Sequence, residues 1–131
     1  MVQGMEQMEV VAANDRFYAA IRSGDFATMD VLWSSRDAVS VYHPNWPGIT
    51  GREQVMASWY DVLVLAEPPG IFPRDVTIIR TERMAFVLCV EEVGGARMTA
   101  SNVFVKERGE WLLTCHHARP LPVRAESKKN R

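Results

Sequence analysis

The chain has 131 residues, of which 47% are hydrophobic and 24% charged, and its formal net charge is -1. That length and composition suit a single globular domain with a core of its own. A near-neutral charge gives no electrostatic basis for nucleic-acid binding, and no apolar stretch approaches the roughly 20 residues that a membrane span needs. We therefore expect neither nucleic acid nor a membrane as a partner.

The first residues, the last residues and the two cysteines indicate where in the cell the protein works and how far its folded domain extends. The first nine residues lack a basic segment followed by an apolar block, so we expect no secretory signal. Cys89 and Cys115 lie in apolar, strand-like runs and form no metal-binding motif, which is typical of reduced core cysteines in a cytoplasmic protein. We expect one domain over residues 1–122 and a flexible basic tail over 123–131.

Helical periodicity dominates the first third of the chain. Apolar residues at helical spacing predict a first helix over residues 5–22. The stripe consists of Val10, Ala13, Phe17, Ala20 and Ile21. Gly24 ends this helix, and Asp25 is a suitable cap for a second, shorter helix that extends to about Trp33.

The segment from Val41 to Gly48 places a His and a Trp between two prolines, directly after a short β-branched strand that ends at Tyr42. Prolines fix φ and bias the preceding residue toward extended backbone, so His43 and Trp46 should lie on a stiff loop, where binding groups often occur. The pattern Thr50-x-x-Glu53 then predicts a capping box at the start of a third helix, which the prolines within residues 67–70 end.

The second half of the chain changes character. Residues 76–81, 85–93, 98–106 and 111–118 are β-branched and aromatic runs, and turn signals separate them. Consecutive strands with short turns form an antiparallel meander. Three helices followed by such a meander predict an α+β fold with the helices on one face of the sheet.

This order of motifs resembles the SnoaL-like branch of the nuclear transport factor 2-like superfamily, over the chain from Phe17 to Pro120. The resemblance lies in Phe17-Tyr18-Ala19-Ala20 with Gly24-Asp25 and Met29, in His43-Pro44-x-Trp46-Pro47 with Gly51-Arg52 and Ser58-Trp59, in Ala100-Ser101-Asn102-Val103-Phe104, and in Gly109-Glu110-Trp111 with His116-His117-Ala118-x-Pro120. It implies a cystatin-like cone: three N-terminal helices packed on a curved, mixed, mostly antiparallel sheet. It also implies dimers through the outer sheet face, and it leaves the activity open because this fold hosts many functions.

Alternation along the strands selects the residues that face the cone. Glu91 and Asn102 are inward candidates on neighbouring strands. In the last strand, alternation puts His117 on the same side as Trp111 and puts His116 on the other, and the family pattern favours His117 inside. A few polar groups that converge in an apolar cavity are typical of a small-molecule site.

Three residues are candidates for acid–base catalysis. Glu91 could carry a raised pKa in apolar surroundings, with His117 as its partner and His43 as a second proton carrier. The alternative for Glu91 is a rim position paired with Arg97 across a hairpin. For both histidines the alternative is a buried ring whose nitrogens are satisfied within the structure.

The candidate ligand-binding residues are Tyr18, Tyr42, Trp46, Trp59, Asn102 and Arg119. The two tryptophans would form apolar walls, although Trp46 could instead be a lid on the core. The tyrosines could hydrogen-bond in the pocket or simply pack their rings, and Asn102 could orient a ligand carbonyl or tie strands together. Relatives often have a small hydroxyl residue at the position of Arg119, which could reach an anion or lie in solvent.

No cofactor or metal is expected. The chain has no glycine-rich phosphate loop and no helical His-x-x-x-His pair. His116 and His117 are adjacent on one strand and point to opposite sides, so at most one of them could join a metal site inside the cone.

Two functions remain open at this point. The first is a pocket for a small apolar or aromatic molecule, with the further option of a cofactor-independent acid/base enzyme of the isomerase, cyclase, dehydratase or hydrolase type. The second is a non-catalytic dimerisation or association domain, because the final strands also resemble the association domain of calcium/calmodulin-dependent kinase. Six apolar residues on the outer sheet face would favour a homodimer: Phe86, Leu88, Val90, Val103, Val105 and Leu112.

Overall fold

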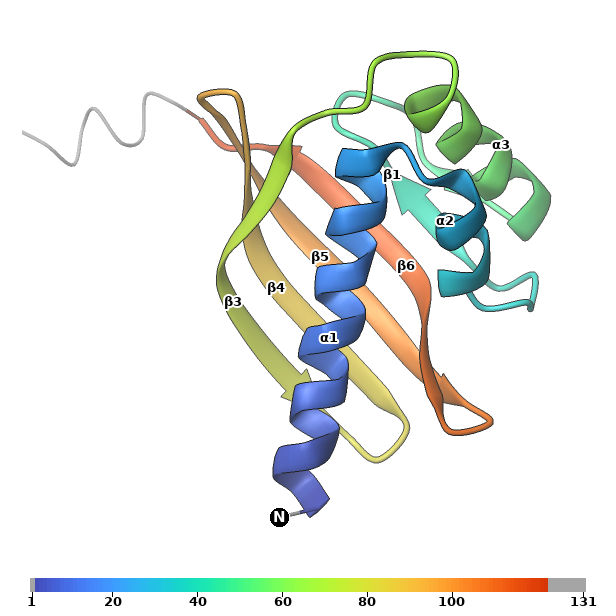
Figure 1. Ribbon diagram of the computed structural model, residues 1–131, viewed down its shortest axis with the longest axis vertical. Coiled ribbons are helices and arrows are strands. Elements are labelled where there is room, and N and C mark those ends of the chain that lie inside the picture. Colours follow the sequence, from blue (N-terminus) through green and yellow to red (C-terminus); the bar gives the residue numbers. More distant parts are fainter. Residues whose placement is uncertain (1, 123–131) are drawn as a thin grey trace, which may run out of the picture.

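The computed structural model describes residues 2–122, with side chains from residue 4 onward, so the predicted tail over 123–131 lies outside the described residues. The elements in chain order are α1 (Val2–Ser23), α2 (Phe26–Leu32), β1 (Ser40–Tyr42), β2 (Ile49–Thr50), α3 (Arg52–Leu63), β3 (Ile71–Arg80), β4 (Met84–Val93), β5 (Ala96–Glu107) and β6 (Glu110–Pro120). The three helices lie on one face of a curved sheet, with α1 along it and α2 and α3 at one end (Figure 1). The predicted α+β class is confirmed. No helix among the described residues is long and apolar enough to cross a membrane.

The sheet has six strands in the order β2-β1-β6-β5-β4-β3. β1 runs parallel to β6, and all other neighbouring pairs are antiparallel. The expected mixed, mostly antiparallel sheet is therefore confirmed. Two features were not predicted: the two-residue strand β2, and the first half of β3, which begins at Ile71 and carries a bulge around Asp75 with a φ of 54°.

α1 packs on the sheet through the apolar stripe predicted from its spacing. All five predicted members are buried: Val10, Ala13, Phe17, Ala20 and Ile21. Tyr18 and Asn14 are buried beside them. α2 begins as predicted at Asp25, whose carboxylate accepts the backbone N–H of Thr28 at 3.0 Å and its hydroxyl at 2.6 Å. Both helices thus follow from local sequence signals.

The start of α3 differs from the predicted capping box. Thr50 pairs with Ser40 in the ladder between β1 and β2, so it stays extended and does not cap the helix. Gly51 takes the cap position with a φ of 91°, a conformation that side-chain-bearing residues avoid. The carboxylate of Asp37, from the loop after α2, accepts the backbone N–H of Arg52 at 2.9 Å instead.

A bulge in β6 reverses the predicted orientation of its second half. In the pairing of β5 with β6, Phe104 lies opposite Leu113, but the adjacent residue of β5, Val103, lies opposite Cys115. Thr114 therefore has no partner on β5. The Thr114 hydroxyl donates to the Ala38 carbonyl at 2.7 Å. One extra residue resets the alternation of side chains.

The histidine prediction is corrected by this bulge. Trp111, which precedes it, is buried on the helix side as predicted. After it, His116 and Ala118 are buried, and His117 lies on the opposite, outer side. The placement of His117 inside the cone was therefore wrong, and His116 occupies that position.

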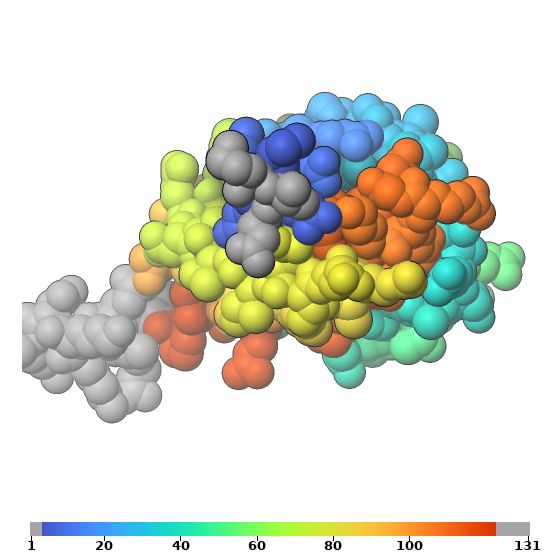
Figure 2. All heavy atoms as spheres, turned by 90° about the horizontal axis from the view of Figure 1, so that it is seen from below, coloured from blue at the N-terminus to red at the C-terminus, as the bar shows by residue number. Residues whose placement is uncertain are grey.

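Ion pairs tie the beginning of α1 to two hairpins. Glu6 accepts from Arg80 of β3 at 2.6 Å and from Lys106 of β5 at 2.9 Å. The hydrogen bond from Lys106 is the largest cause of the lowered pKa of Glu6. Figure 2 views the molecule from this end, where the first turns of α1 meet the turns of the β-hairpins.

We predict that Trp111→Ala lowers the free energy of unfolding by about 3–5 kcal/mol, because a large buried aromatic leaves a cavity that cannot fully collapse. Urea denaturation measures this loss. Leu112→Ala is the matched control, since its half-buried side chain faces the other side of the sheet and should cost only about 1 kcal/mol. A loss below ~1 kcal/mol for Trp111→Ala would contradict the packing of this strand.

Candidate functional site

A carboxylate is buried under α1. Glu91, on β4, has 1% of its surface exposed. The hydroxyl of Tyr18, on the buried stripe of α1, donates to Glu91 Oε2 at 2.7 Å. The same hydroxyl lies 3.3 Å from the sulfur of Cys89, one inward position earlier on β4. The alternation of β4 thus aims a thiol and a carboxylate at one tyrosine hydroxyl.

Asn102 on β5 connects this pair to two further polar groups. Its Nδ2 donates to the Tyr18 hydroxyl at 3.0 Å and to Asn14 Oδ1 at 2.9 Å. Its Oδ1 lies 2.5 Å from Nδ1 of His116, on β6. The other ring nitrogen of His116, Nε2, lies 3.8 Å from Glu91 Oε2. We refer to Asn14, Tyr18, Glu91, Asn102 and His116 as the inner polar cluster.

Aromatic side chains enclose the cluster on the helix side. The ring of Phe17 lies 4.9 Å from that of His116 and 5.6 Å from that of Trp59, centroid to centroid. Trp59 also meets the ring of His43 at 4.7 Å. The Nε2 of His43 lies 2.9 Å from the hydroxyl of Ser58, one residue before Trp59 on α3. His43 therefore borders the cluster through aromatic contacts.

Burial perturbs the acidic groups of the cluster. Loss of solvent raises the pKa of Glu91 to about 7, although the hydrogen bond from Tyr18 opposes this shift. Burial also raises the pKa of Tyr18 far above its usual range and the pKa of Cys89 to about 11. Near neutral pH, Tyr18 and Cys89 thus keep their protons and Glu91 exchanges its own.

The two buried histidines are neutral at pH 7. Burial lowers the pKa of His43 to about 4. Burial, reinforced by the neighbouring His43 and His117, lowers the pKa of His116 to about 3. Each ring then carries one proton and one free lone pair. The cluster accordingly contains one group that titrates near pH 7, Glu91.

Most of the chain matches a known domain family. A SnoaL-like domain model matches residues 10–122. The chain belongs to the SnoaL-like domain family. Among curated proteins, the F-box protein SKIP8 of Arabidopsis thaliana is 26% identical over 114 residues, which cover 83% of this chain and 48% of that protein. This SnoaL-like domain therefore spans about half the length of the curated relative it matches.

Two solved structures are similar along nearly their whole lengths. A candidate dehydratase of the NTF2-like family from Streptomyces avermitilis is 31% identical, with a TM-score of 0.84, covering 92% of this chain and 99% of that one. A candidate calcium/calmodulin-dependent protein kinase type II association domain from Thiobacillus denitrificans is 28% identical, with a TM-score of 0.78, covering 85% and 94%. The expected cystatin-like fold is also that of a structural neighbour.

The SnoaL-like domain brings together five of the residues singled out from the sequence: Tyr18, His43, Trp59, Glu91 and Asn102, all of them buried. The rim alternative for Glu91 was wrong, because its side chain faces inward and Arg97 stands opposite Glu92 in the ladder. Trp46 lies at the edge of this group. Its ring contacts that of His43 at 4.8 Å, and 39% of its surface is exposed.

The other three residues lie apart from the cluster. Tyr42, His117 and Arg119 line a hollow of about 410 Å³ on the outer face of the sheet, together with Thr99 and Ser101. The ring of Tyr42 stands edge-on to that of His117 at 4.8 Å. They lie on the face of the sheet away from Glu91, because β1 presents Val41 inward and the bulge turns His117 outward.

Sequence reasoning missed His116 and Asn14. The bulge that turns His116 inward leaves no signal in the alternation of β6. Asn14 did leave one, since it falls within the buried stripe of α1, four residues before Tyr18. A polar residue on an apolar helix face needs a hydrogen-bond partner, and Asn102 supplies it.

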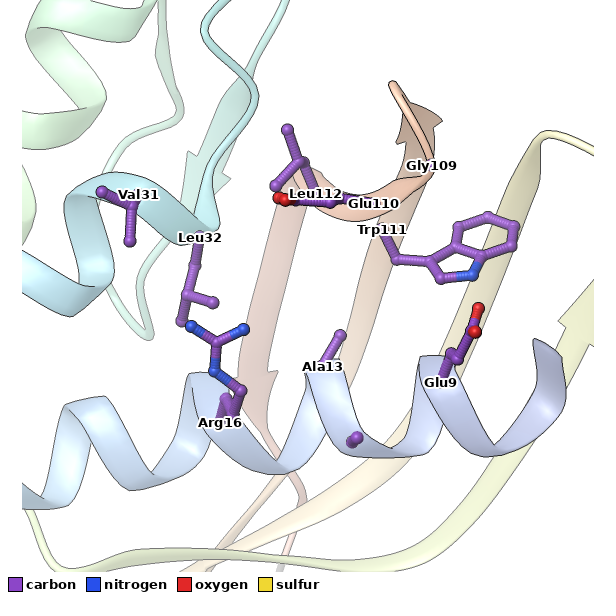
Figure 3. Close-up of a pocket in the computed structure, with 10 residues that line it drawn as sticks. Glu9, Ala13, Arg16, Val31, Leu32, Gly109, Glu110, Trp111 and Leu112 are labelled. Atoms are coloured by element: carbon purple, nitrogen blue, oxygen red, sulfur yellow. The ribbon is translucent and has the colours of Figure 1, made fainter. Parts of the chain in front are cut away.

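Two hollows lie along α1. One, of about 390 Å³, lies between α1, α2 and the start of β6, where Glu9 lies beside Trp111 and Arg16 beside Leu32 (Figure 3). The other, of about 500 Å³, lies between α1 and β3 and is lined by Tyr18, Arg22 and Phe72 among others. Tyr18 thus belongs both to a hollow and to the inner polar cluster. Among residues 2–122, no three His, Cys, Asp or Glu side chains are grouped to hold a metal ion.

Burial of Glu91 predicts a pH-dependent cost to stability. Its folded pKa, about 7, exceeds the ordinary 4.5, so the unfolded chain releases this proton first as pH rises. The stability of the wild type relative to Glu91→Gln should therefore fall between pH 4.5 and about 7, by roughly 3 kcal/mol, and stay level above.

Urea denaturation of both proteins from pH 4 to 8 measures this difference. The histidines titrate in both proteins and cancel, while Tyr18 and Cys89, which face Glu91, keep their protons throughout this range. A stability difference that does not change with pH would show that Glu91 is not held in the protonated form by burial.

Proposed function

We propose that this chain binds a small, mostly apolar or aromatic molecule beneath α1 and moves a proton with Glu91, without a cofactor. The observation that carries the proposal is a carboxyl group with 1% of its surface exposed, a pKa of about 7 and a tyrosine hydroxyl on one oxygen. A general base works best when its pKa lies near the working pH. Glu91 meets this condition.

The surroundings favour a substrate that carries a hydrogen-bond acceptor. Trp59 Nε1 and Asn14 Nδ2 are buried donors that find no acceptor among residues 2–122. An unsatisfied buried donor costs about 1–3 kcal/mol, so a carbonyl oxygen that accepts from either would recover part of this cost. Phe17 and Trp59 supply apolar walls, and Tyr18 also lines the hollow between α1 and β3.

Proton abstraction next to a carbonyl is the reaction class that these groups serve best. The Glu91 carboxylate would take the proton, and a buried donor would stabilise the negative oxygen that develops. His43, with a pKa of about 4, and His116, with a pKa of about 3, stay neutral, so the proton remains on Glu91; His116 takes the inward position beside Glu91 that the sequence gave to His117. Of the four classes considered, a dehydratase fits best, because the Streptomyces avermitilis relative is a candidate dehydratase.

A deuterium-exchange assay tests this proposal. We predict that the protein catalyses exchange of the α-protons of apolar aromatic ketones or 3-hydroxy ketones in D₂O near neutral pD, and that Glu91→Gln slows it at least ~100-fold. Proton NMR of a panel of such compounds measures the exchange. Glu92→Gln, the same change one residue along on the outer side of β4, is the matched control and should leave the rate unchanged.

Two outcomes would contradict the catalytic proposal. Exchange that survives Glu91→Gln would show that another group removes the proton. If no member of the panel binds or exchanges, the second function below becomes the better account.

The second candidate is an association domain, and the outer sheet face favours it. Phe86 and Leu88 are 39% and 42% exposed there, and four half-buried side chains adjoin them: Val90, Val103, Val105 and Leu112. The similar Thiobacillus denitrificans protein is a candidate association domain. A second copy with the same face would bury this surface in a two-fold homodimer.

We predict a homodimer that buries at least ~1,000 Å² in total through this face. Leu88→Asp should convert it to a folded monomer, because it puts a carboxylate in the middle of the contact. Light scattering at micromolar concentration, with circular dichroism to check folding, measures the result. Leu65→Asp is the control, since Leu65 is 68% exposed on the loop after α3. A folded Leu88→Asp dimer would place the contact elsewhere.

A cytoplasmic location is also part of the proposal. Cys89 and Cys115 are both free, and they lie on opposite faces of the sheet. Free thiols, of which Cys89 is buried and Cys115 half-buried, persist in reducing compartments.

A further inference from the structure

The donor and the acceptor of each hydrogen bond in the inner polar cluster can be deduced one after another, starting from Glu91. Tyr18 has a single hydroxyl proton, and at 2.7 Å it belongs to Oε2 when Glu91 is ionised. The Tyr18 oxygen is then an acceptor toward Asn102, at 3.0 Å. Asn102 must therefore present its NH₂ group to Tyr18, and the same group reaches Asn14 Oδ1 at 2.9 Å.

This orientation leaves Asn102 with an acceptor toward His116. Asn102 Oδ1 lies 2.5 Å from His116 Nδ1, so that nitrogen must carry the proton. A neutral imidazole has one N–H, which leaves a bare lone pair on Nε2, 3.8 Å from Glu91 Oε2. The hydrogen bonds that start at Glu91 Oε2 therefore end on a ring whose bare nitrogen lies 3.8 Å from the same oxygen.

We propose that Asn102 is a positioning residue: it fixes the Nδ1–H tautomer of His116 and so keeps the Nε2 lone pair, rather than an N–H donor, directed at Glu91. The inference deepens the proposed function, since it concerns the environment of the proposed base. In the other tautomer His116 would turn an N–H toward Glu91 across 3.8 Å, and the positive end of that dipole would favour the ionised form, which lowers the pKa of Glu91 and weakens it as a base. Asn102 prevents this by supplying an acceptor on the far side of the ring.

The second buried histidine, His43, carries its proton on the other ring nitrogen and so provides a comparison within the same protein. The Ser58 hydroxyl donates its one proton to the Val55 carbonyl at 2.7 Å. Its oxygen therefore accepts from His43, which must be protonated on Nε2. One protein thus holds two buried neutral histidines in opposite tautomers, and the whole chain has only three histidines.

Long-range ¹H–¹⁵N correlation spectra of the full-length, uniformly ¹⁵N-labelled protein at about pH 8, where Glu91 is mostly ionised, test the proposal, because they separate protonated from bare ring nitrogens. In the wild type we expect a protonated Nδ1 and a bare Nε2 for His116, and the reverse for His43. Asn102→Leu removes the acceptor and should abolish the Nδ1-protonated signal of His116. Asn102→Asp keeps an oxygen at that position and should retain the Nδ1 proton.

Ser58→Ala is the matched control, since it removes a buried polar group and should change the signals of His43 but not those of His116. An Nε2-protonated His116 in the wild type would mean that the amide is reversed, and would overturn the proposal. So would an unchanged His116 tautomer in Asn102→Leu, or loss of the Nδ1 proton in Asn102→Asp. If Asn102→Leu does not fold, the wild-type spectrum and Asn102→Asp still decide.

The spectra require no substrate, so this test is independent of the exchange assay. An inactive protein with the expected tautomers would leave the arrangement of His116 intact and remove the proposed enzymology. An active protein with Nε2-protonated His116 would do the opposite.

Discussion

The hydrogen bond from Tyr18 to Glu91 joins the first helix to the middle of the sheet, and the interior is arranged around it. A carboxyl group in such a place must be either neutral or well supported, because an ionised group away from water is costly. In this structure the two requirements are each met in part. The Tyr18 hydroxyl donates a hydrogen bond to Oε2, which supports the ionised form, while burial favours the neutral form and raises the pKa to about 7. Neither charge state is therefore strongly preferred at neutral pH. The surrounding amides and rings are oriented by this one contact.

The bulge at Thr114 gives the interior its histidine. Without the extra residue, the last strand would present Cys115 inward and His116 to the outer face, and Asn102 would lack its ring partner. The bulge is held where the loop after α2 crosses β6: Ser34 donates its backbone N–H to the Leu113 carbonyl at 2.8 Å, and the Thr114 hydroxyl donates to Ala38. The geometry of the site thus depends on a loop that contributes no side chain to it.

Most of the fold, and half of the site, could be predicted from the sequence. Alternation correctly placed Glu91 and Asn102 because β4 and β5 pair without interruption. It failed for His116 and His117 because a bulge at Thr114 shifts the alternation by one residue. The hydrophobic residues before and after the bulge give no sign of that shift in the sequence. The capping box failed for a related reason, since β-pairing of Thr50 overrode a local preference. Tyr42 was misplaced with His117, which it faces across the β1–β6 ladder.

The inner polar cluster also sets a condition on how the protein is made. Tyr18 and Glu91 are 73 residues apart in the chain, and His116 follows later still. At a synthesis rate of about 5–20 residues per second, α1 leaves the ribosome roughly 4–15 seconds before its carboxylate partner exists. Until then the stripe that carries Phe17 and Tyr18 has no sheet to pack on. A nascent chain of this protein therefore displays the apolar face of α1 until the strands of the sheet have been made, and it buries that face only when the last strands arrive.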